Sequence, residues 1–352
     1  MFNLSSITRK NIKNLRPYSS ARDEFSGTAA AFLDANENSL GSPLGNDHSR
    51  YPDPHQLALK GAIARNKELT IENIFLGNGS DECIDILYRS FCEPGKDNVI
   101  ICPPTYGMYE VSAQINDIEI RKATLLDNFQ LDINAINALV DHNTKMIWIC
   151  SPNNPTGNCI DMGDIKQLAI NFSGLVVIDE AYIDFASSDS FVGELINFPN
   201  LVVLQTFSKA WGLAALRLGM AFASKEIIAV LNKVKPPYNI SGPAQQLVLK
   251  ALRENERFET NISELIGLRT TLAKGLERLP AIKKLYPTET NFILASVTNA
   301  TALYNYLLDK GVVVRNRSNI VLCESCLRIT VGTEQQNELL ITALKNYSNQ
   351  LA

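Results

Sequence analysis

The sequence predicts an α/β fold with a large domain, built on a mostly parallel central sheet with helices on both faces, and a smaller α/β domain. Two observations lead to this prediction. From about residue 70 to 225, short apolar runs alternate with helix-like segments, which is the pattern of a parallel sheet covered by helices. After about residue 260 a long helical pattern precedes further strand-like runs. The 352 residues are enough for two such units.

Four apolar runs predict buried parallel strands, because strands that are covered on both faces are continuously hydrophobic. These runs are 99–102, 146–150, 175–178 and 201–204. Each run is followed by an unusual polar segment, at 103–106, 151–157, 179–182 and 206–209 respectively. Ligands of open α/β sheets bind outside the carboxyl ends of the strands. We therefore expect the four polar segments to converge on one site.

The chain after residue 260 predicts the smaller domain. A helical pattern covers 258–279, with apolar residues at spacings of three and four. Strand-like runs follow at 291–294, 311–315 and 326–332, and a helix is expected between the first two. The last two runs each carry an arginine, Arg315 and Arg328, which would point toward a cleft.

Composition and charge exclude several functions. A net charge of −4 provides no basic surface for nucleic acid or an anionic membrane, and no uncharged apolar run approaches the ~18 residues that span a bilayer. Residues 1–20 carry four cations and no acid, so they are either a transit peptide or, as we adopt here, a helix or arm of the folded protein. Seven cysteines, an odd number, predict reduced thiols and a cytoplasmic location. The pair Cys323 and Cys326 has no second pair with zinc spacing, and we expect no metal.

The segment 201–217 carries the most chemical information. Its strand-like run ends in Thr206, Ser208 and Lys209, and Arg217 follows eight positions after the lysine. A lysine amine forms Schiff bases with carbonyl compounds, including the aldehyde of pyridoxal phosphate. Two hydroxyls and a guanidinium are suitable partners for a phosphate dianion. An amine and a phosphate site on one turn predict a pyridoxal-phosphate enzyme.

Six motifs carry a resemblance to a known family. They are LDANEN (33–38), RYPD (50–53), GNGSDE (77–82), FCEPG (91–95), PPTYGMY (103–109) and LRITVG (327–332). Together they resemble the fold-type I pyridoxal-phosphate aminotransferases and, among these, the histidinol-phosphate aminotransferase family. The resemblance runs from about residue 15 to the C-terminus. It implies an N-terminal arm over 1–45 that contributes to the small domain, a large cofactor-binding domain over 46–260, and a small domain over 261–352.

The resemblance implies a role for each matching residue around the cofactor. Lys209 would bind the aldehyde and, once freed, act as general base. Asp179 would keep the pyridine nitrogen protonated, Tyr182 and Asn154 would donate to the phenolate oxygen of the ring, and Tyr106 would stack on its face. Without the resemblance, Asp179 could equally cap a helix and Tyr106 could simply pack.

The phosphate of the cofactor would lie at the start of a helix. Ser80 and Asp81 precede a helix-like stretch, whose N-terminal N–H groups suit an anion, although Asp81 is itself an acid and could be a simple cap. Thr206, Ser208 and Arg217 would complete the phosphate site. Tyr51 matches a residue that reaches the phosphate from the partner subunit, which implies a homodimer with shared active sites.

The substrate would be held by residues of the arm and the small domain. Arg328 matches the arginine that pairs with the anionic end of the substrate, and Arg315 matches a second arginine. Asn36 and Tyr18 match positions that line the pocket. Each arginine could otherwise belong to a structural salt bridge.

The reaction implied by the resemblance is transamination of L-histidinol phosphate with 2-oxoglutarate, which yields imidazole-acetol phosphate and L-glutamate in histidine biosynthesis. The donor has no carboxylate, so one site would have to accept a phosphate and a carboxylate in turn, which guanidiniums do better than ammonium groups. Three alternatives stay open: an aromatic-amino-acid aminotransferase, a decarboxylase acting on a compound such as threonine phosphate, and a binding or regulatory protein that has kept the fold only.

Overall fold

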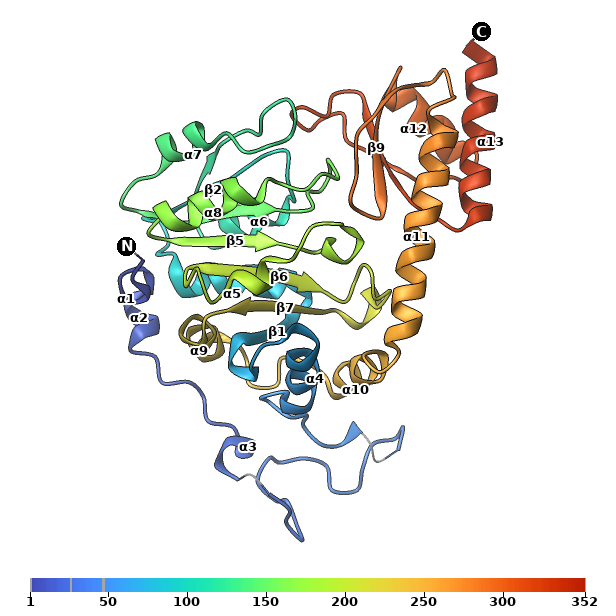
Figure 1. The fold of residues 1–352 in the computed structure, drawn as a ribbon. Coiled ribbons are helices and arrows are strands. Elements are labelled where there is room, and N and C mark those ends of the chain that lie inside the picture. Colours follow the sequence, from blue (N-terminus) through green and yellow to red (C-terminus); the bar gives the residue numbers. More distant parts are fainter. Residues whose placement is uncertain (1, 26, 46–47, 352) are drawn as a thin grey trace.

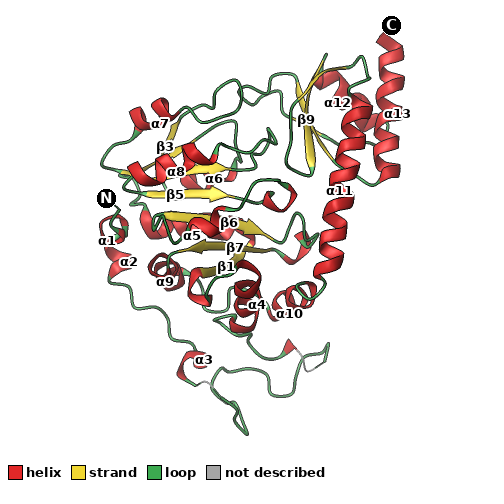
Figure 2. Ribbon diagram, viewed as in Figure 1, coloured by secondary structure: helices red, strands yellow, loops and turns green. Residues whose placement is uncertain are grey.

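A seven-stranded sheet forms the centre of the larger part of the molecule. The computed structural model describes residues 2–25, 27–45 and 48–351, and Figures 1 and 2 show the sheet as a layer between helices. Its strands are β1 (Ile74–Asn78), β2 (Asn98–Ile101), β3 (Glu119–Lys122), β4 (Thr144–Cys150), β5 (Leu175–Asp179), β6 (Leu201–Thr206) and β7 (Leu218–Ala223). Their spatial order is β1-β7-β6-β5-β4-β2-β3, and within this sheet β7 runs antiparallel to both neighbours. The predicted mostly parallel central sheet is confirmed.

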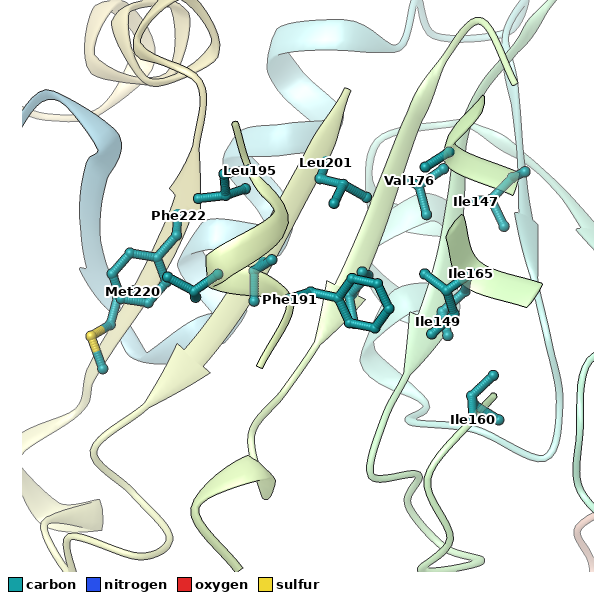
Figure 3. Packing of buried hydrophobic residues seen from close by; sticks show 14 of the residues in the cluster. Ile147, Ile149, Ile160, Ile165, Val176, Phe191, Leu195, Leu201, Met220 and Phe222 are labelled. Atoms are coloured by element: carbon teal, nitrogen blue, oxygen red, sulfur yellow. The ribbon is translucent and has the colours of Figure 1, made fainter. Parts of the chain in front are cut away.

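The four predicted strands of this sheet, now β2, β4, β5 and β6, are covered on both faces. In β5, Val176 and Ile178 belong to one hydrophobic cluster, whereas Leu175 and Val177 belong to another on the opposite face. Figure 3 shows part of the first cluster, in which Val176 is paired in register with Ile147 of β4. Because both faces of these strands pack against helices, functional polar side chains are found at the strand ends.

Helices from distant parts of the chain cover each face. The first cluster includes residues of α4 (Leu57–Lys67), α7 (Ile133–Leu139), α8 (Met162–Asn171) and α10 (Gly242–Ala251), and the second includes residues of α5 (Gly79–Phe91), α6 (Met108–Ile115) and α9 (Lys225–Val234). Short 3-10 turns complete this part: η2 (Ile71–Asn73), η3 (Ile183–Phe185), η4 (Phe191–Glu194) and η5 (Ala214–Leu216). Side-chain N-caps define where several of these helices begin. Asp161 accepts the N–H groups of Gly163 and Asp164 at α8, and Ser224 accepts that of Ile227 at α9.

A second, smaller sheet is built by the C-terminal part of the chain. Its antiparallel strands are β8 (Ile282–Leu285), β9 (Phe292–Val297), β10 (Arg315–Asn316) and β11 (Cys326–Thr330), in the order β10-β11-β9-β8. The accompanying helices are α11 (Asn255–Leu276), α12 (Ala300–Asp309) and α13 (Glu334–Leu351). In Figure 1, α11 extends from α10, beside the large sheet, to the second sheet. The predicted domain boundary at 260/261 falls inside this continuous helix.

The structure corrects one expected strand and adds four others. Of the run 311–315, only Arg315 belongs to a strand, which it forms with Asn316. The strands β1, β3, β7 and β8 were not predicted. β3 and β8 are edge strands with part of their surface exposed, so they lack the long hydrophobic run that marks a central strand.

The N-terminal arm begins against the large sheet. It contains the short helices α1 (Leu4–Ile7), α2 (Lys10–Lys13) and α3 (Ala21–Glu24). Ile7 packs in the second cluster, and Arg9 donates to the backbone oxygen of Arg89 in α5 at 2.9 Å. Within one chain these contacts lie on the large-sheet side, and the contribution of the arm to the small domain stays a prediction. The described residues leave out Met1, which begins the predicted arm, and residues 46–47, which begin the predicted large domain. Residues 26 and 352 are also outside the described residues. No helix in the described part of the chain is both long and apolar enough to cross a membrane.

Candidate active site

A cavity of about 510 Å³ lies at the carboxyl ends of the central strands. Strands β4, β5 and β6 lead into it, and residues of the second sheet close its other side. The predicted site residues that line it are Ser80, Asp81, Tyr106, Asn154, Asp179, Tyr182, Thr206, Ser208, Lys209, Arg217, Arg315 and Arg328. Polar segments that are far apart in sequence therefore meet at one place, as the position of the strand ends requires.

Lys209 is on the turn that follows β6, with its side chain open to the cavity. Its amine lies 5.5 Å from the ring centroid of Tyr182. Desolvation by the cavity walls, and secondly the positive charge of Arg328, lower the pKa of the Lys209 amine below its usual range. A larger fraction of this amine is consequently neutral near neutral pH than for a free lysine, which suits both a nucleophile and a base.

Asp179 ends β5 and is buried, with 2% of its surface exposed. The hydroxyl of Tyr109 donates to its Oδ2 at 2.7 Å, and the backbone N–H of Ala181 donates to its Oδ1 at 3.0 Å. Burial raises the pKa of the Asp179 carboxyl, and these hydrogen bonds partly oppose the shift. A buried carboxylate that has no cationic side chain in an ion pair is a suitable partner for a cationic ring nitrogen.

Tyr109 was not assigned a role from the sequence, although it lies in the PPTYGMY motif. It is fully buried and stacks on Trp148 with 5.0 Å between ring centroids. Tyr106, the other tyrosine of the motif, faces the cavity instead, and its hydroxyl donates to Oδ1 of Asp81 at 3.0 Å. A motif identifies both tyrosines but does not say which of them contacts the buried acid.

The groups predicted to bind phosphate form one end of the cavity, at the start of α5. Gly79 has a φ of +72°, and a Cβ there would lie 2.7 Å from Nη2 of Arg217. A Cβ on Gly219 would collide with the backbone of Gly79 and Ser80. Two glycines are therefore required for the backbone and the guanidinium to approach each other this closely. Asp81 forms an ion pair with Arg217 at 3.3 Å.

The turn after β6 adds two hydroxyl groups. Thr206 and Ser208 hydrogen-bond to each other through their hydroxyls at 3.0 Å, and the N–H of Ser208 donates to Oγ1 of Thr206 at the same distance. Together with the N-terminus of α5 and Arg217, these groups form an anion site. An amine, a buried carboxylate and an anion site in one cavity fit the aldehyde, ring nitrogen and phosphate of pyridoxal phosphate.

The opposite end of the cavity is formed by the second sheet. Arg315 of β10 and Arg328 of β11 are paired in register, so their side chains leave the sheet together. Nη1 of Arg328 donates to Oδ1 of Asn154, and its guanidinium lies 5.1 Å from the ring centroid of Phe292. Arg317, which was not predicted, also lines this end. The alternation of side chains in an extended segment, which puts residues 315 and 317 on one side, could have indicated it.

Three predicted residues lie outside this cavity in the single chain. Tyr18 lines a different cavity, of about 500 Å³, beside His55 and Lys235. Asn36 is exposed, with a φ of +53°. Tyr51 is 51% exposed and stacks on Tyr238 with 4.5 Å between centroids. The structure of one chain therefore does not bring these three residues to the cavity, and their roles stay predictions.

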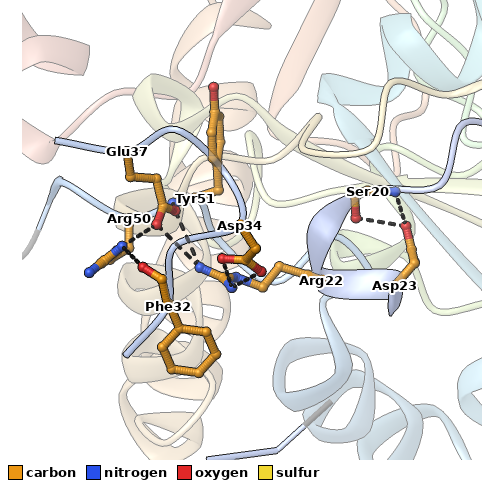
Figure 4. Close-up of polar contacts among 8 residues, drawn as sticks. All are labelled: Ser20, Arg22, Asp23, Phe32, Asp34, Glu37, Arg50 and Tyr51. Atoms are coloured by element: carbon orange, nitrogen blue, oxygen red, sulfur yellow. Dashed lines mark hydrogen bonds and ion pairs between the residues drawn. The ribbon is translucent and has the colours of Figure 1, made fainter. Parts of the chain in front are cut away.

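Glu37 is half-buried, with 2% of its side chain exposed, and it holds the backbone next to Tyr51. Figure 4 shows Glu37 between Arg22 and Arg50, and it also accepts the N–H of Tyr51 at 2.7 Å. Burial alone would raise the pKa of Glu37, but hydrogen bonds from Arg50 and the Tyr51 N–H outweigh it and lower the pKa. The network links the segment that carries Asn36 to the segment that carries Tyr51.

Glu37→Ala is expected to loosen the arm without unfolding the large domain. The change removes the acceptor for two arginines and one backbone N–H, and each such charge-assisted contact contributes roughly 1.5–3 kcal/mol. Limited proteolysis should cleave the arm around residues 25–50 at least about tenfold faster, because local opening precedes cleavage. Glu24→Ala, at an exposed residue of α3, is the matched control. Equal cleavage rates for wild type and Glu37→Ala would contradict the proposed role of Glu37 in holding the arm in place.

Of the seven cysteines, Cys150 at the end of β4 is buried and lines the cavity, and the other six lie outside it. All seven are free, and Cys323 and Cys326 are buried. Burial raises the pKa of Cys323 to about 12 and that of Cys326 to about 11. Within the residues that the structure describes, no group of three or more histidine, cysteine or acidic side chains is arranged to hold a metal ion.

Comparisons with known proteins agree with this geometry. The model of the aminotransferase class I and II family matches residues 26–344. A histidinol-phosphate aminotransferase of Cytophaga hutchinsonii is 54% identical over 346 residues, covering 98% of this chain and 99% of the relative. The solved histidinol-phosphate aminotransferase of Clostridium acetobutylicum is 27% identical, with a TM-score of 0.78 over 86% of this chain and 91% of the other. That of Sinorhizobium meliloti, in complex with pyridoxal-5'-phosphate, shares the fold with a TM-score of 0.80, at 23% identity over 90% of each chain.

Proposed function

The chain belongs to the histidinol-phosphate aminotransferase family of the class I and II aminotransferases, and we propose that it transfers the amino group of L-histidinol phosphate to 2-oxoglutarate with pyridoxal phosphate as cofactor. The observation that carries this proposal is the position of Lys209. Its amine opens into a cavity that has anion-binding groups at both ends, one for the cofactor and one for the substrate. Identity of about half over the full chain favours histidinol phosphate over an aromatic amino acid or a decarboxylase substrate.

The residues around Lys209 are suited to hold the cofactor. When bound, pyridoxal phosphate supplies an aldehyde that exchanges amines and a protonated ring that accepts electrons. Asp179 would hold the proton on the ring nitrogen, and Tyr182 and Asn154 would donate hydrogen bonds to the phenolate oxygen. The phosphate would be bound by the N-terminus of α5, with the groups Ser80, Thr206, Ser208 and Arg217. Tyr106 would cover one face of the ring, and the backbone N–H groups beside Asp81, rather than its carboxylate, would contribute to phosphate binding.

Lys209 would carry the proton in the reaction. Its lowered pKa would leave its neutral amine able to take the proton from the Cα of the donor and to hold that proton within the cavity. Arg315 and Arg328 would hold the phosphate of the donor in one half-reaction and a carboxylate of 2-oxoglutarate in the other. The closed, arginine-lined end would keep both substrates in one orientation relative to Lys209.

We further propose that two copies of the chain form a homodimer in which each arm completes the site of the partner. Three exposed leucines of the arm support this: Leu33, Leu40 and Leu44 are 85%, 94% and 88% exposed. Large apolar side chains that are exposed together are typical of an interface. In such a dimer Tyr51 would reach the cofactor phosphate of the partner, and Tyr18 and Asn36 would line the partner's substrate pocket. Seven free cysteines support a reducing, cytoplasmic location.

The direct test is turnover of L-histidinol phosphate and 2-oxoglutarate by the purified protein loaded with pyridoxal phosphate. We expect glutamate to form in proportion to imidazole-acetol phosphate. Phenylalanine and threonine phosphate are the comparison substrates, with release of glutamate or CO₂ as the respective products. Efficient use of either one, without use of histidinol phosphate, would refute the proposed substrate and leave the cofactor site in place.

Mixing two inactive variants tests the shared site. Tyr51→Ala and Lys209→Ala homodimers should each be poorly active, whereas a mixed dimer contains one site with an intact Lys209 and an intact Tyr51 from opposite chains. After equimolar subunit exchange, half of the dimers are mixed, so about a quarter of wild-type activity should return. Mass spectrometry of differently tagged chains verifies the exchange. Complete exchange without recovered activity would contradict the shared site.

A further inference from the structure

Arg317 is a third guanidinium at the substrate end of the cavity. It follows β10, and its backbone N–H donates to the carbonyl oxygen of Cys326 at 2.9 Å, which ties it to β11. It lines the cavity together with Arg315 and Arg328. The Nε atom of Arg317 is buried and has no hydrogen-bond partner, and the same is true of Nε of Arg328. Buried donors without partners are rare in folded proteins, and because these two belong to side chains that line a cavity, a group bound there is the explanation that we adopt.

These three guanidiniums carry positive charge that the described part of the chain does not balance with a contacting acid. Among the described residues, none of them forms an ion pair with a carboxylate. The pKa of Arg317 is lowered first by desolvation and then by the positive charges of Arg328 and Arg315. At the other end of the cavity, by contrast, Arg217 is paired with Asp81. The two ends therefore differ in charge, and the excess of positive charge lies at the end that meets the substrate.

The number of guanidiniums distinguishes between two kinds of anion. One bidentate guanidinium satisfies a carboxylate, which has two oxygens and one negative charge. A phosphate monoester has three terminal oxygens and nearly two charges at neutral pH. We infer that Arg317 is a specificity-determining residue that binds the phosphate of the donor and contributes little to binding of the carboxylate acceptor. This inference rests on the proposed function and assigns a selective role to a residue outside the pair Arg315 and Arg328.

Arg317→Gln in the holoenzyme tests the selectivity. We expect KM for L-histidinol phosphate to rise about 10- to 100-fold, because a charge-assisted contact is lost, while KM for 2-oxoglutarate rises no more than about threefold. The kcat at saturation should change by less than about threefold, since Arg317 does not touch the reacting carbon. Arg317→Lys keeps the charge without the planar fork and should recover part of the loss. Arg253→Gln, at an exposed position after α10, matches the change in charge and should leave all constants unchanged.

Calorimetric titration of the holoenzyme with inorganic phosphate gives a second readout that does not require turnover. The cofactor already occupies the Arg217 end, so the titration reports on the arginine end. Wild type should bind phosphate about tenfold more tightly than Arg317→Gln, and acetate should bind both alike.

The outcomes separate this inference from the proposed function. If wild type turns over histidinol phosphate and Arg317→Gln matches it in KM and in phosphate binding, the inference is overturned and the function stands. An equal loss for phosphate and carboxylate ligands also overturns it. If wild type fails with histidinol phosphate, but Arg317→Gln still weakens phosphate binding selectively, the proposed substrate falls and the phosphate site remains.

Discussion

Lys209→Ala is expected to lower the turnover number by at least about 10³-fold while the protein still folds and binds its cofactor. A positioned general base contributes roughly 10²–10⁴-fold, and Lys209 is the one lysine among the described residues that line the cavity. Asp179 and the phosphate-binding groups remain in the variant, so the cofactor should still bind. The loss should appear in the transfer of the proton, measured by single-turnover absorbance of the loaded enzyme.

Chemical rescue separates loss of the base from loss of structure. Methylamine is small enough to enter the space that the truncated side chain leaves, and it should restore part of the single-turnover rate in Lys209→Ala and none in wild type. Borohydride should attach the cofactor covalently to Lys209 in wild type and not in the variant, as peptide mapping would show. Lys250→Ala, at an exposed position of α10, is the control for charge. Turnover of Lys209→Ala within tenfold of wild type would overturn the assignment.

The sequence predicted the part of the fold whose cause is local. Strands β4, β5 and β6 lie between two hydrophobic clusters, so continuous runs such as 175–178 mark them without knowledge of their neighbours. The strand ends, and with them the polar segments around Asp179 and Lys209, follow from those runs. The parallel direction of these strands makes the segments that follow them meet, and this accounts for Asn154, Asp179 and Lys209 sharing one cavity. Arg217, Arg315 and Arg328 reach the same cavity from antiparallel strands or their connections, so their positions do not follow from this rule.

What the sequence did not predict depends on the neighbours of each residue. The direction of β7 is set by its pairing with β1 and β6, and nothing in its composition indicates that it is antiparallel. Strand β8 is at the edge of its sheet, and its two central residues, Lys283 and Lys284, are exposed, so it lacks the alternation that marks a half-buried strand. Tyr109 and Tyr106 occupy the same motif, and only the packing of α6 decides that Tyr109 contacts Asp179.

Three residues in or next to the N-terminal arm were predicted to contact substrate or cofactor, but in a single chain they do not reach the cavity. The resemblance implied substrate or cofactor contacts for Tyr18, Asn36 and Tyr51, and in one chain they face other surroundings. Arg317 is the converse case. It lies two residues after Arg315 in the sequence, but the role that we infer for it rests on its position in the cavity and on its buried Nε, neither of which the sequence shows.

Asp179→Asn is expected to lower turnover by about 10²–10⁴-fold and to leave the fold intact. The amide has the shape of the carboxyl group, and the hydroxyl of Tyr109 can still donate to its oxygen. What is lost is the charge that would hold a proton on the ring nitrogen. Breaking a buried ion pair costs about 3–5 kcal/mol, and each 1.36 kcal/mol corresponds to a tenfold change in rate. Single-turnover and steady-state rates of the loaded variant measure the effect.

The melting temperature of the cofactor-free protein gives an independent check. Replacing a residue that supports the fold lowers this temperature, whereas replacing Asp179 is not expected to lower it. Burial raises the pKa of Asp179 in the folded protein above its ordinary value of 3.8. Its favourable contribution to stability is therefore complete below pH 3.8 and is lost as the pH rises through the folded-state pKa. Asparagine does not ionise. At pH 8 the cofactor-free variant should consequently melt at the same temperature as wild type or above it.

Adding pyridoxal phosphate should reverse this order. The cationic ring gives the Asp179 carboxylate a partner, so the cofactor should raise the Tm of wild type more than that of Asp179→Asn. Tyr109→Phe, which keeps the stacking on Trp148 and removes one donor to Asp179, should lie between the two. If the cofactor raises both melting temperatures equally, or if Asp179→Asn destabilises the cofactor-free protein, then Asp179 supports the fold and another group protonates the ring.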